Sequence, residues 1–398
     1  MSFRVSGPEG GTMAGTDFPQ RERITLLACF LAGGLGIGSW GANLPALGRR
    51  AGLDEGALGL VLLSFAAGAI LAMTKAPPVI ARIGAERLSV IAAGLFGLGI
   101  IGIGWVTQMA AAVILASLAG LVFGALDVAM NSQASYLERR ARRPVMSSFH
   151  AMFSAGTLIG ALTYAALAHR GVGNGSILSL SGSVIVVIAV AAFTRTTVAV
   201  AEPANDATTA RSRARPGIAV LVLGTLAFVI FLAEGAIMDW AAVYLVRVIG
   251  TSESIGAAGY AIFAGMMLLG RLLGDRANRA LGPSRLFRIS VAAVALSMAA
   301  FLLSGSVYLA FAALACSGLA MANVIPLIFS AAGMLGARDG GRSLSRVISM
   351  GYAGILLGPA LIGFLAQAVS LTASLSLVLV GLAAVAFFGR HFKEGILS

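Results

Sequence analysis

Charged residues are scarce in this sequence: they make up 11% of the chain, against roughly a quarter in a soluble globular domain. Apolar residues make up 58%, and the mean hydropathy is +0.93. A soluble core of this length does not need so much apolar surface, because most residues of a soluble domain still touch water. The scarcity of charge therefore excludes a soluble globular domain and indicates a chain embedded in a bilayer.

Cysteine is also rare, and both copies, Cys29 and Cys316, lie inside apolar runs. No Cys-x-x-Cys pair or metal-ligand spacing occurs, so neither a disulfide framework nor a zinc site is expected. The chain has no phosphate-binding loop of the Gly-x-x-x-x-Gly-Lys-Ser/Thr type and no nucleophile elbow. These absences argue against an ATP-driven pump and a hydrolase, and they predict a protein that is not an enzyme and uses no cofactor.

The formal net charge is +12, which in a soluble protein would favour nucleic-acid binding. In a membrane protein the same charge marks the loops on one side, so no nucleic-acid partner is expected. The 14 methionines suggest copper, because Cu(I) prefers thioether ligands, but methionine is also an ordinary gap filler. Copper or a vitamin is therefore kept as a minor alternative cargo.

The hydropathy pattern predicts an all-α membrane protein of twelve transmembrane helices, because a span needs about 20 predominantly apolar residues. The expected spans are 24–48, 55–75, 87–106, 109–137, 147–168, 176–194, 217–246, 254–274, 286–305, 307–335, 345–369 and 371–389. The long polar interruption at 195–216 divides them into two six-helix bundles, 24–194 and 217–390. We expect short tails at 1–23 and 391–398.

Basic residues lie mainly on one side of this arrangement. If both termini are inside, 24 of the 28 Lys and Arg residues face the cytoplasm and 4 face outward. This split is typical of the positive-inside rule. It predicts a multi-pass membrane protein in contact with lipid, with both termini and the 195–216 linker cytoplasmic.

The two halves show a weak internal repeat. Trp40 in the first span matches Trp240 in the seventh at an offset of 200, and Gly156 in the fifth matches Gly354 in the eleventh at an offset of 198. Transporters often carry such repeated halves, with the binding site between them. The repeat therefore points to the region where the two bundles meet.

The residues at 270–276, Gly-Arg-Leu-Leu-Gly-Asp-Arg, run from the end of the eighth span into the loop before the ninth. With the twelve spans, this loop resembles the cytoplasmic signature of the major facilitator superfamily. The resemblance implies two pseudo-symmetric bundles and secondary transport by alternating access in a monomer. It also implies gating roles for Asp275, Arg276 and Arg82, although the loop that contains Arg82 lacks the acidic residue.

A narrower resemblance rests on two segments, Gly-Ala-Leu-Asp-Val-Ala-Met-Asn at 124–131 and Glu-Gly-Ala-Ile-Met-Asp-Trp-Ala-Ala-Val-Tyr-Leu at 234–245. They are similar to uncharacterised bacterial inner-membrane members near the fucose-permease-like, sugar-type branch. The fifth span lacks the Gly-Pro motif of drug antiporters, which appears instead as Gly358-Pro359 in the eleventh. The resemblance implies a small polar solute.

Three carboxylates lie within predicted spans, and an intramembrane charge is a functional candidate by default. Glu234 is the expected proton carrier, because no basic residue shares the core of its span and an isolated buried carboxyl favours its neutral form. Asp127 is the alternative carrier. Asp239 lies nearer the outer end, where it would bind substrate or serve a wet gate.

Asp127 and Asn131 are four residues apart on one helix face, and His150 opens the next span at the same inner side. These three residues are expected to meet, either as a proton relay or as a hydrogen-bonded inner gate. The remaining substrate-binding candidates are aromatic or amide side chains in spans: Trp40, Asn43, Trp240, Tyr244 and Asn323. Membrane anchoring and hydrogen bonding between helices are the alternatives for these residues.

The leading hypothesis is a proton-coupled carrier of a small, sugar-like or otherwise hydrophilic solute. An exporter of amphipathic compounds is the alternative within transport. A sensor or scaffold that has lost transport is the alternative outside it.

The charge split predicts where the 195–216 linker lies. A cysteine placed in this linker should react with a membrane-impermeant maleimide only after the cells are opened. Labelling of intact cells would show that the orientation is reversed.

Overall fold

The computed structural model describes residues 20–141, 145–196, 217–336 and 342–389, and every regular element in these ranges is an α-helix. The helices are α1 (Gln20–Arg50), α2 (Glu55–Ile83), α3 (Ala85–Ile103), α4 (Met109–Ala141), α5 (Met146–His169), α6 (Asn174–Phe193), α7 (Ile218–Arg247), α8 (Glu253–Leu281), α9 (Pro283–Leu302), α10 (Val307–Met321), α11 (Val324–Gly336), α12 (Arg342–Ala368) and α13 (Leu371–Gly389). The predicted C-terminal tail, and most of the linker and the N-terminal tail, lie outside the described residues.

Helices α10 and α11 together make one membrane span, so the described part of the chain confirms twelve crossing helices. Eleven spans are long and apolar enough to cross a membrane, and α13 supplies a shorter apolar twelfth. The predicted span 307–335 is interrupted at Ala322–Asn323. Pro326 explains the break, because proline has no N–H to donate to the carbonyl four residues earlier, at Ala322.

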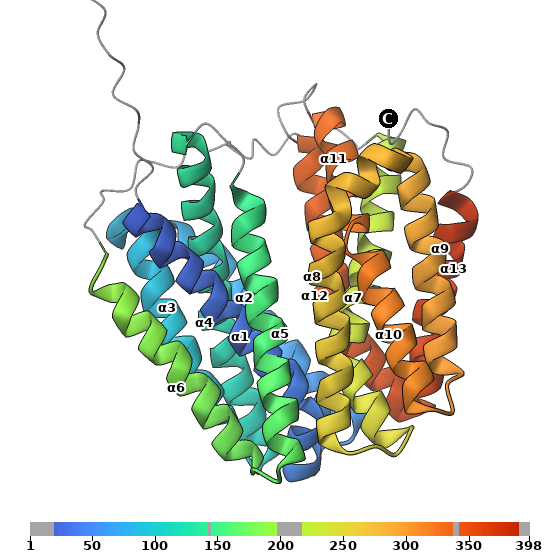
Figure 1. Ribbon diagram of the computed structural model, residues 1–398, viewed down its shortest axis with the longest axis horizontal. Helices are drawn as coiled ribbons and strands as arrows, with labels where there is room; N and C mark the ends of the chain where they lie inside the picture. The colour runs from blue at the N-terminus through green and yellow to red at the C-terminus, as the bar shows by residue number, and fades with distance from the viewer. Residues whose placement is uncertain (1–19, 142–144, 197–216, 337–341, 390–398) are drawn as a thin grey trace, which may run out of the picture.

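The helices form two bundles, α1–α6 and α7–α13 (Figure 1). Glycine allows helices to approach closely within each bundle. A Cβ at Gly34 or Gly38 of α1 would collide with the α5 backbone at Phe153 or Thr157, and one at Gly354 of α12 would collide with the α7 backbone at Phe228. Such contacts bring helix backbones together where the bilayer supplies no hydrophobic force.

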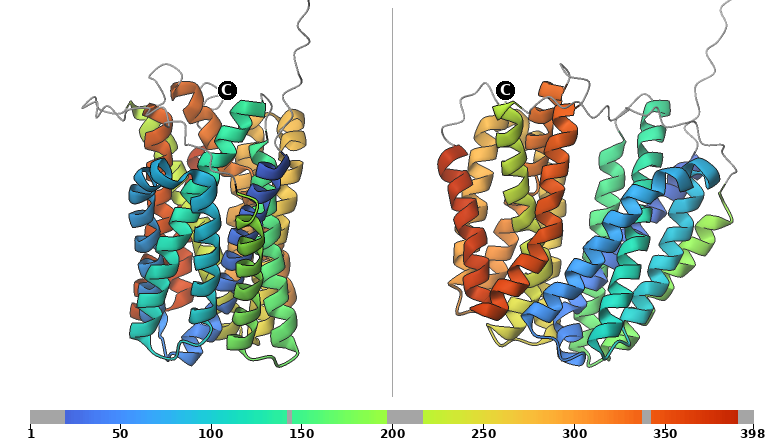
Figure 2. Two further views of the ribbon diagram at one scale, coloured as in Figure 1. Left: turned by 90° about the vertical axis from the view of Figure 1, so that its left-hand side faces the viewer. Right: turned by 180° about the vertical axis from the view of Figure 1, so that it is seen from behind.

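The bundles touch at one end of the molecule and diverge toward the other (Figures 1 and 2). We call the first the closed end; it holds the turns at 51–54 and 248–252. We call the second the terminal end; there α1 begins and α13 ends.

Two ion pairs join the bundles at the closed end. Arg49 Nε of α1 lies 2.7 Å from Glu253 Oε1 of α8, and Arg247 Nη1 of α7 lies 2.8 Å from Glu55 Oε1 of α2. The two arginines are 198 residues apart, as are the two glutamates. The internal repeat therefore places the same ion pair twice, each arginine reaching the glutamate of the opposite bundle.

Hydrogen bonds reinforce these pairs. Arg247 Nη2 donates to the carbonyl of Leu53 at 2.6 Å, and Gln367 Nε2 of α12 donates to Asp54 Oδ2 at 3.0 Å. The Arg49 side chain is 66% exposed and the Arg247 side chain 25% exposed. The Arg247–Glu55 pair is better shielded from water, so we expect it to contribute more to closure.

Breaking the Arg247–Glu55 pair should open the closed end. For a pair contributing about 1 kcal/mol, Glu55→Gln raises the open population roughly fivefold. Electron–electron distance measurements between spin labels on the 51–54 and 248–252 turns would detect the change. The charge swap Glu55→Arg with Arg247→Glu should restore closure, and Arg170→Gln should have no effect. An unchanged distance distribution in Glu55→Gln would contradict this role.

Candidate functional site

A charged contact joins the two bundles away from the closed end. Arg271 of α8 directs Nη2 toward Glu234 Oε1 of α7 at 3.8 Å, and its Nη1 donates to Ser154 Oγ of α5 at 2.8 Å. Glu234 is buried, whereas the Arg271 side chain is 38% exposed. We call Ser154, Glu234 and Arg271 the central cluster. It links a carboxylate of one bundle to a hydroxyl of the other through a single guanidinium.

The expectation that Glu234 has no cation partner is wrong. It considered the residues of one span, whereas Arg271 comes from the neighbouring helix α8. Arg271 is one of the 24 basic residues of the predicted cytoplasmic side, yet it is the only charged residue in the predicted span 254–274. That isolation within an apolar run was the signal that could have identified it. Without Arg271, 23 of the 24 charges remain on the predicted inner side.

Asp127 and Asn131 contact each other as their spacing predicts. Asn131 Nδ2 donates to Asp127 Oδ1 at 3.1 Å and to the Asp127 carbonyl at 2.9 Å. Tyr352 of α12 lies within electrostatic reach of Asp127 in the first bundle and of Glu234 in the second. Tyr352 was missed because a single tyrosine in an apolar helix has no distinguishing pattern.

His150 does not join Asp127 and Asn131. Its ring meets Phe30 of α1 edge-on, with centroids 5.4 Å apart, and it lies within electrostatic reach of Arg271. In the described residues no hydrogen bond links the imidazole to either polar residue of α4. The three-residue relay therefore stays a prediction, and the described side-chain contacts of His150 are with Phe30 and Arg271.

Two candidates of the first span are held inside the first bundle. Trp40 is buried and stacks on Phe65, with ring centroids 5.2 Å apart. Asn43 Oδ1 accepts a hydrogen bond from Tyr164 Oη at 3.3 Å, and the same hydroxyl accepts one from Asn174. Asn174 also donates to Glu253 at 3.0 Å. Asn43 thus supports the closed end through hydrogen bonds between helices.

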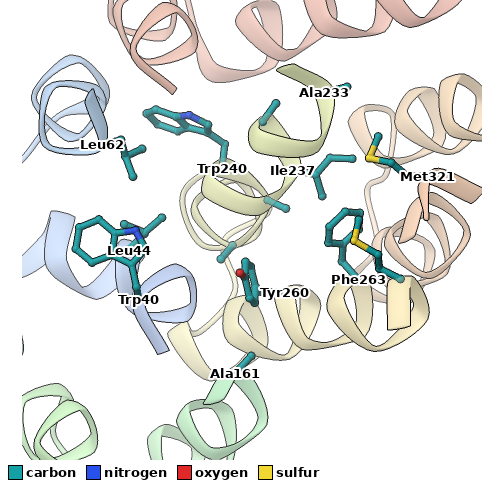
Figure 3. Packing of buried hydrophobic residues seen from close by; sticks show 14 of the residues in the cluster. Trp40, Leu44, Leu62, Ala161, Ala233, Ile237, Trp240, Tyr260, Phe263 and Met321 are labelled. Carbon is teal, nitrogen blue, oxygen red and sulfur yellow. The ribbon is translucent and has the colours of Figure 1, made fainter. Parts of the chain in front are cut away.

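Trp240 lies where α7 approaches the other bundle (Figure 3), and Asp239 precedes it in the same helix. Trp240 is fully buried near Gly363 of α12, and its Nε1 has no hydrogen-bond partner among the described residues. Asp239 lies within electrostatic reach of Tyr260, whose ring packs on Gly41 of α1. Over the same part of the chain, no ion pair neutralises Asp239. Both remain candidates for binding substrate.

Tyr244 and Asn323 face the interior of the second bundle instead. The Tyr244 hydroxyl donates to the Leu302 carbonyl at 3.1 Å, and its ring packs on Phe301 at 4.9 Å. Asn323 lies in the α10–α11 break and donates from Nδ2 to the Gly270 carbonyl at 3.0 Å. These contacts give both residues a structural role.

The gating candidates Asp275, Arg276 and Arg82 are exposed at the terminal end, where the bundles diverge. Among the described residues none of the three takes part in an ion pair. Their pairing in another conformation stays a prediction. No three His, Cys, Asp or Glu side chains in the described ranges are grouped as metal ligands.

Twelve apolar crossing helices in two bundles, with charged side chains where the bundles face each other, define a membrane transport protein. The profile of the Major Facilitator Superfamily matches residues 25–332, and the chain belongs to this family. An uncharacterised MFS-type transporter of Yersinia pestis is 33% identical over 366 residues, covering 92% of this chain and 94% of the relative. Membrane protein MosC of Rhizobium meliloti is 31% identical over 390 residues, covering 95% and 94%.

Solved structures share the fold. A mutant of the nucleoside transporter NupG superposes with a TM-score of 0.73 at 13% identity, covering 93% of this chain and 100% of that one. A bacterial homologue of the human lysosomal transporter Spinster, in an inward-facing and occupied conformation, gives 0.70 at 14% identity, covering 92% and 95%. The resemblance to the fucose-permease-like branch stays a prediction.

The contacts of Tyr244 predict a stabilising role without a transport role. Tyr244→Phe removes the bond to the Leu302 carbonyl and should lower stability by about 1 kcal/mol, because a buried acceptor loses its partner. The melting temperature of the purified protein should fall while uptake by correctly folded protein is unchanged. Loss of uptake at unchanged stability would instead make Tyr244 a substrate-binding residue.

Proposed function

We propose that the protein is a proton-coupled secondary transporter that moves a small polar solute across a bacterial inner membrane by alternating access. The observation that carries this proposal is the Glu234–Arg271–Ser154 link between the bundles. Solute and ion sites of such transporters lie where the repeated halves meet. We propose that the protein acts as a monomer, with both termini cytoplasmic.

Glu234 is the proposed proton carrier. When the carboxylate is ionised, Arg271 balances its charge; when it is protonated, Arg271 loses that partner and is free to reorient. An unpaired charge within the membrane costs about 2.5–3.5 kcal/mol on insertion scales, so the two protonation states favour different arrangements of α7, α8 and α5. Proton binding is thereby coupled to the contact between the bundles.

The proposed orientation makes the closed end the outer side and the terminal end the inner side. The basic charge bias supports this orientation. In the opposite state the closed-end ion pairs separate and the terminal ends approach each other. Asp275, Arg276 and Arg82 are the proposed contacts there, because a carboxylate facing an arginine gains charge-assisted hydrogen bonds.

A second candidate function, export of amphipathic compounds, has one observation in its favour. The partly buried rings of Phe65, Phe123 and Phe153 follow one another in the first bundle, with centroids 5.9 and 6.4 Å apart. Asn43 and Asn323, two of the substrate-binding candidates, make hydrogen bonds between helices. Transport assays with lipophilic cations distinguish this function, and absence of any transport would favour a sensor or scaffold.

Glu234→Gln tests the coupling. Glutamine is nearly isosteric and cannot release a proton, so accumulation driven by a proton gradient in liposomes should be abolished while solute exchange partly persists. Asp127→Asn is the matched comparison in the other bundle. Gradient-driven accumulation that survives in both variants would mean that neither acid couples protons.

A further inference from the structure

We propose that the transported solute carries an anionic group, a carboxylate or a phosphate, and that Arg271 binds this group with the help of His150. The inference rests on the proposed function, since it names the substrate class of the same site.

Arg271 is incompletely satisfied by the protein. A guanidinium has five N–H donors in a planar fork, and the described contacts engage Nη1 with Ser154 and, at the long distance of 3.8 Å, Nη2 with Glu234. The Arg271 side chain is 38% exposed, whereas the Glu234 side chain is 11% exposed. The cation is therefore more open to a ligand than the carboxylate that balances it.

The surroundings of Arg271 add a further donor, the His150 imidazole, while Ser154 holds the guanidinium in place by accepting from it. The Ser154 hydroxyl and the imidazole of His150 lie one turn apart on α5, where Ser154 Oγ donates to the His150 carbonyl at 3.1 Å. His150 is exposed and lies within electrostatic reach of Arg271. An arginine fork with an imidazole N–H within electrostatic reach matches the oxygen atoms of a carboxylate or phosphate.

Glu234 and the anion compete for the same guanidinium. The titratable groups that face Glu234 are Arg271 and Tyr260 from α8 and Tyr352 from α12, and Tyr352 also faces Asp127. Arg271 is the only permanent cation among them. Protonation of Glu234 leaves Arg271 with a net positive charge, which an anion then neutralises. Proton and anion therefore favour each other's binding, and acidic pH strengthens anion binding.

The test is a thermal-shift screen with matched sets of metabolites, each carbon frame offered as carboxylate, phosphate, neutral alcohol and amine. A ligand that binds only the folded state raises the melting temperature. We expect carboxylates or phosphates, and not their neutral or amine counterparts, to stabilise the protein. Comparison of the carboxylate with the phosphate compound of each set identifies which anionic group the site binds.

Variants locate the anion. Arg271→Gln should weaken binding about 10- to 100-fold, because one charged hydrogen-bonding group is lost. Arg271→Lys should retain part of the affinity, and Arg288→Gln, at an exposed arginine of α9, should bind as the wild type does. Stabilisation by neutral or amine compounds alone, or wild-type affinity in Arg271→Gln, would overturn the proposal.

The pH dependence supplies a readout that does not require Arg271 variants to fold. In the wild-type protein anion affinity should rise as pH falls. Glu234→Gln should bind the anion tightly over the whole pH range, and any pH dependence that remains in this variant comes from His150. Affinity that is independent of pH in the wild type would count against the competition. If anions bind in this way but Glu234→Gln still accumulates solute, the anion site stands and the proposed coupling fails.

Discussion

The architecture depends on one constraint: a charge inside a bilayer is costly, and Glu234 meets its counter-charge on a neighbouring helix. Glu234 and Arg271 satisfy each other between α7 and α8, and Arg271 also reaches Ser154 in the opposite bundle. Removing one partner would leave an uncompensated charge, which is strongly unfavourable. The contact between the bundles therefore responds to any event that changes the charge of either group, which is the physical basis of the proposed coupling.

The closed end follows from the duplication of the chain. An arginine at the end of the first helix of each half and a glutamate at the start of the second recur at an offset of 198 residues. When the two halves face each other, each arginine meets the other half's glutamate, and two ion pairs form from one repeated pattern. These pairs are near water and individually weak. Weak contacts suit a carrier whose two conformations must differ little in free energy.

The fold could be predicted because apolar length and charge asymmetry are properties of single segments. The site could be predicted only in part, because neighbouring helices determine it. Asn131 lies one turn from Asp127 and was paired correctly, whereas the partner of Glu234 lies 37 positions away on another helix. Tyr244 and Asn323 resembled binding residues, but polar side chains in spans are often satisfied by nearby backbone carbonyls, as these are.

The central claim is that proton and anion share Arg271 through Glu234, so that each changes the affinity of the other. The most direct measurement is proton uptake by purified protein in weakly buffered solution when a stabilising carboxylate or phosphate is added near neutral pH. The account predicts that the wild-type protein takes up protons as the anion binds and that Glu234→Gln takes up fewer. Anion binding without proton uptake in the wild-type protein would contradict it.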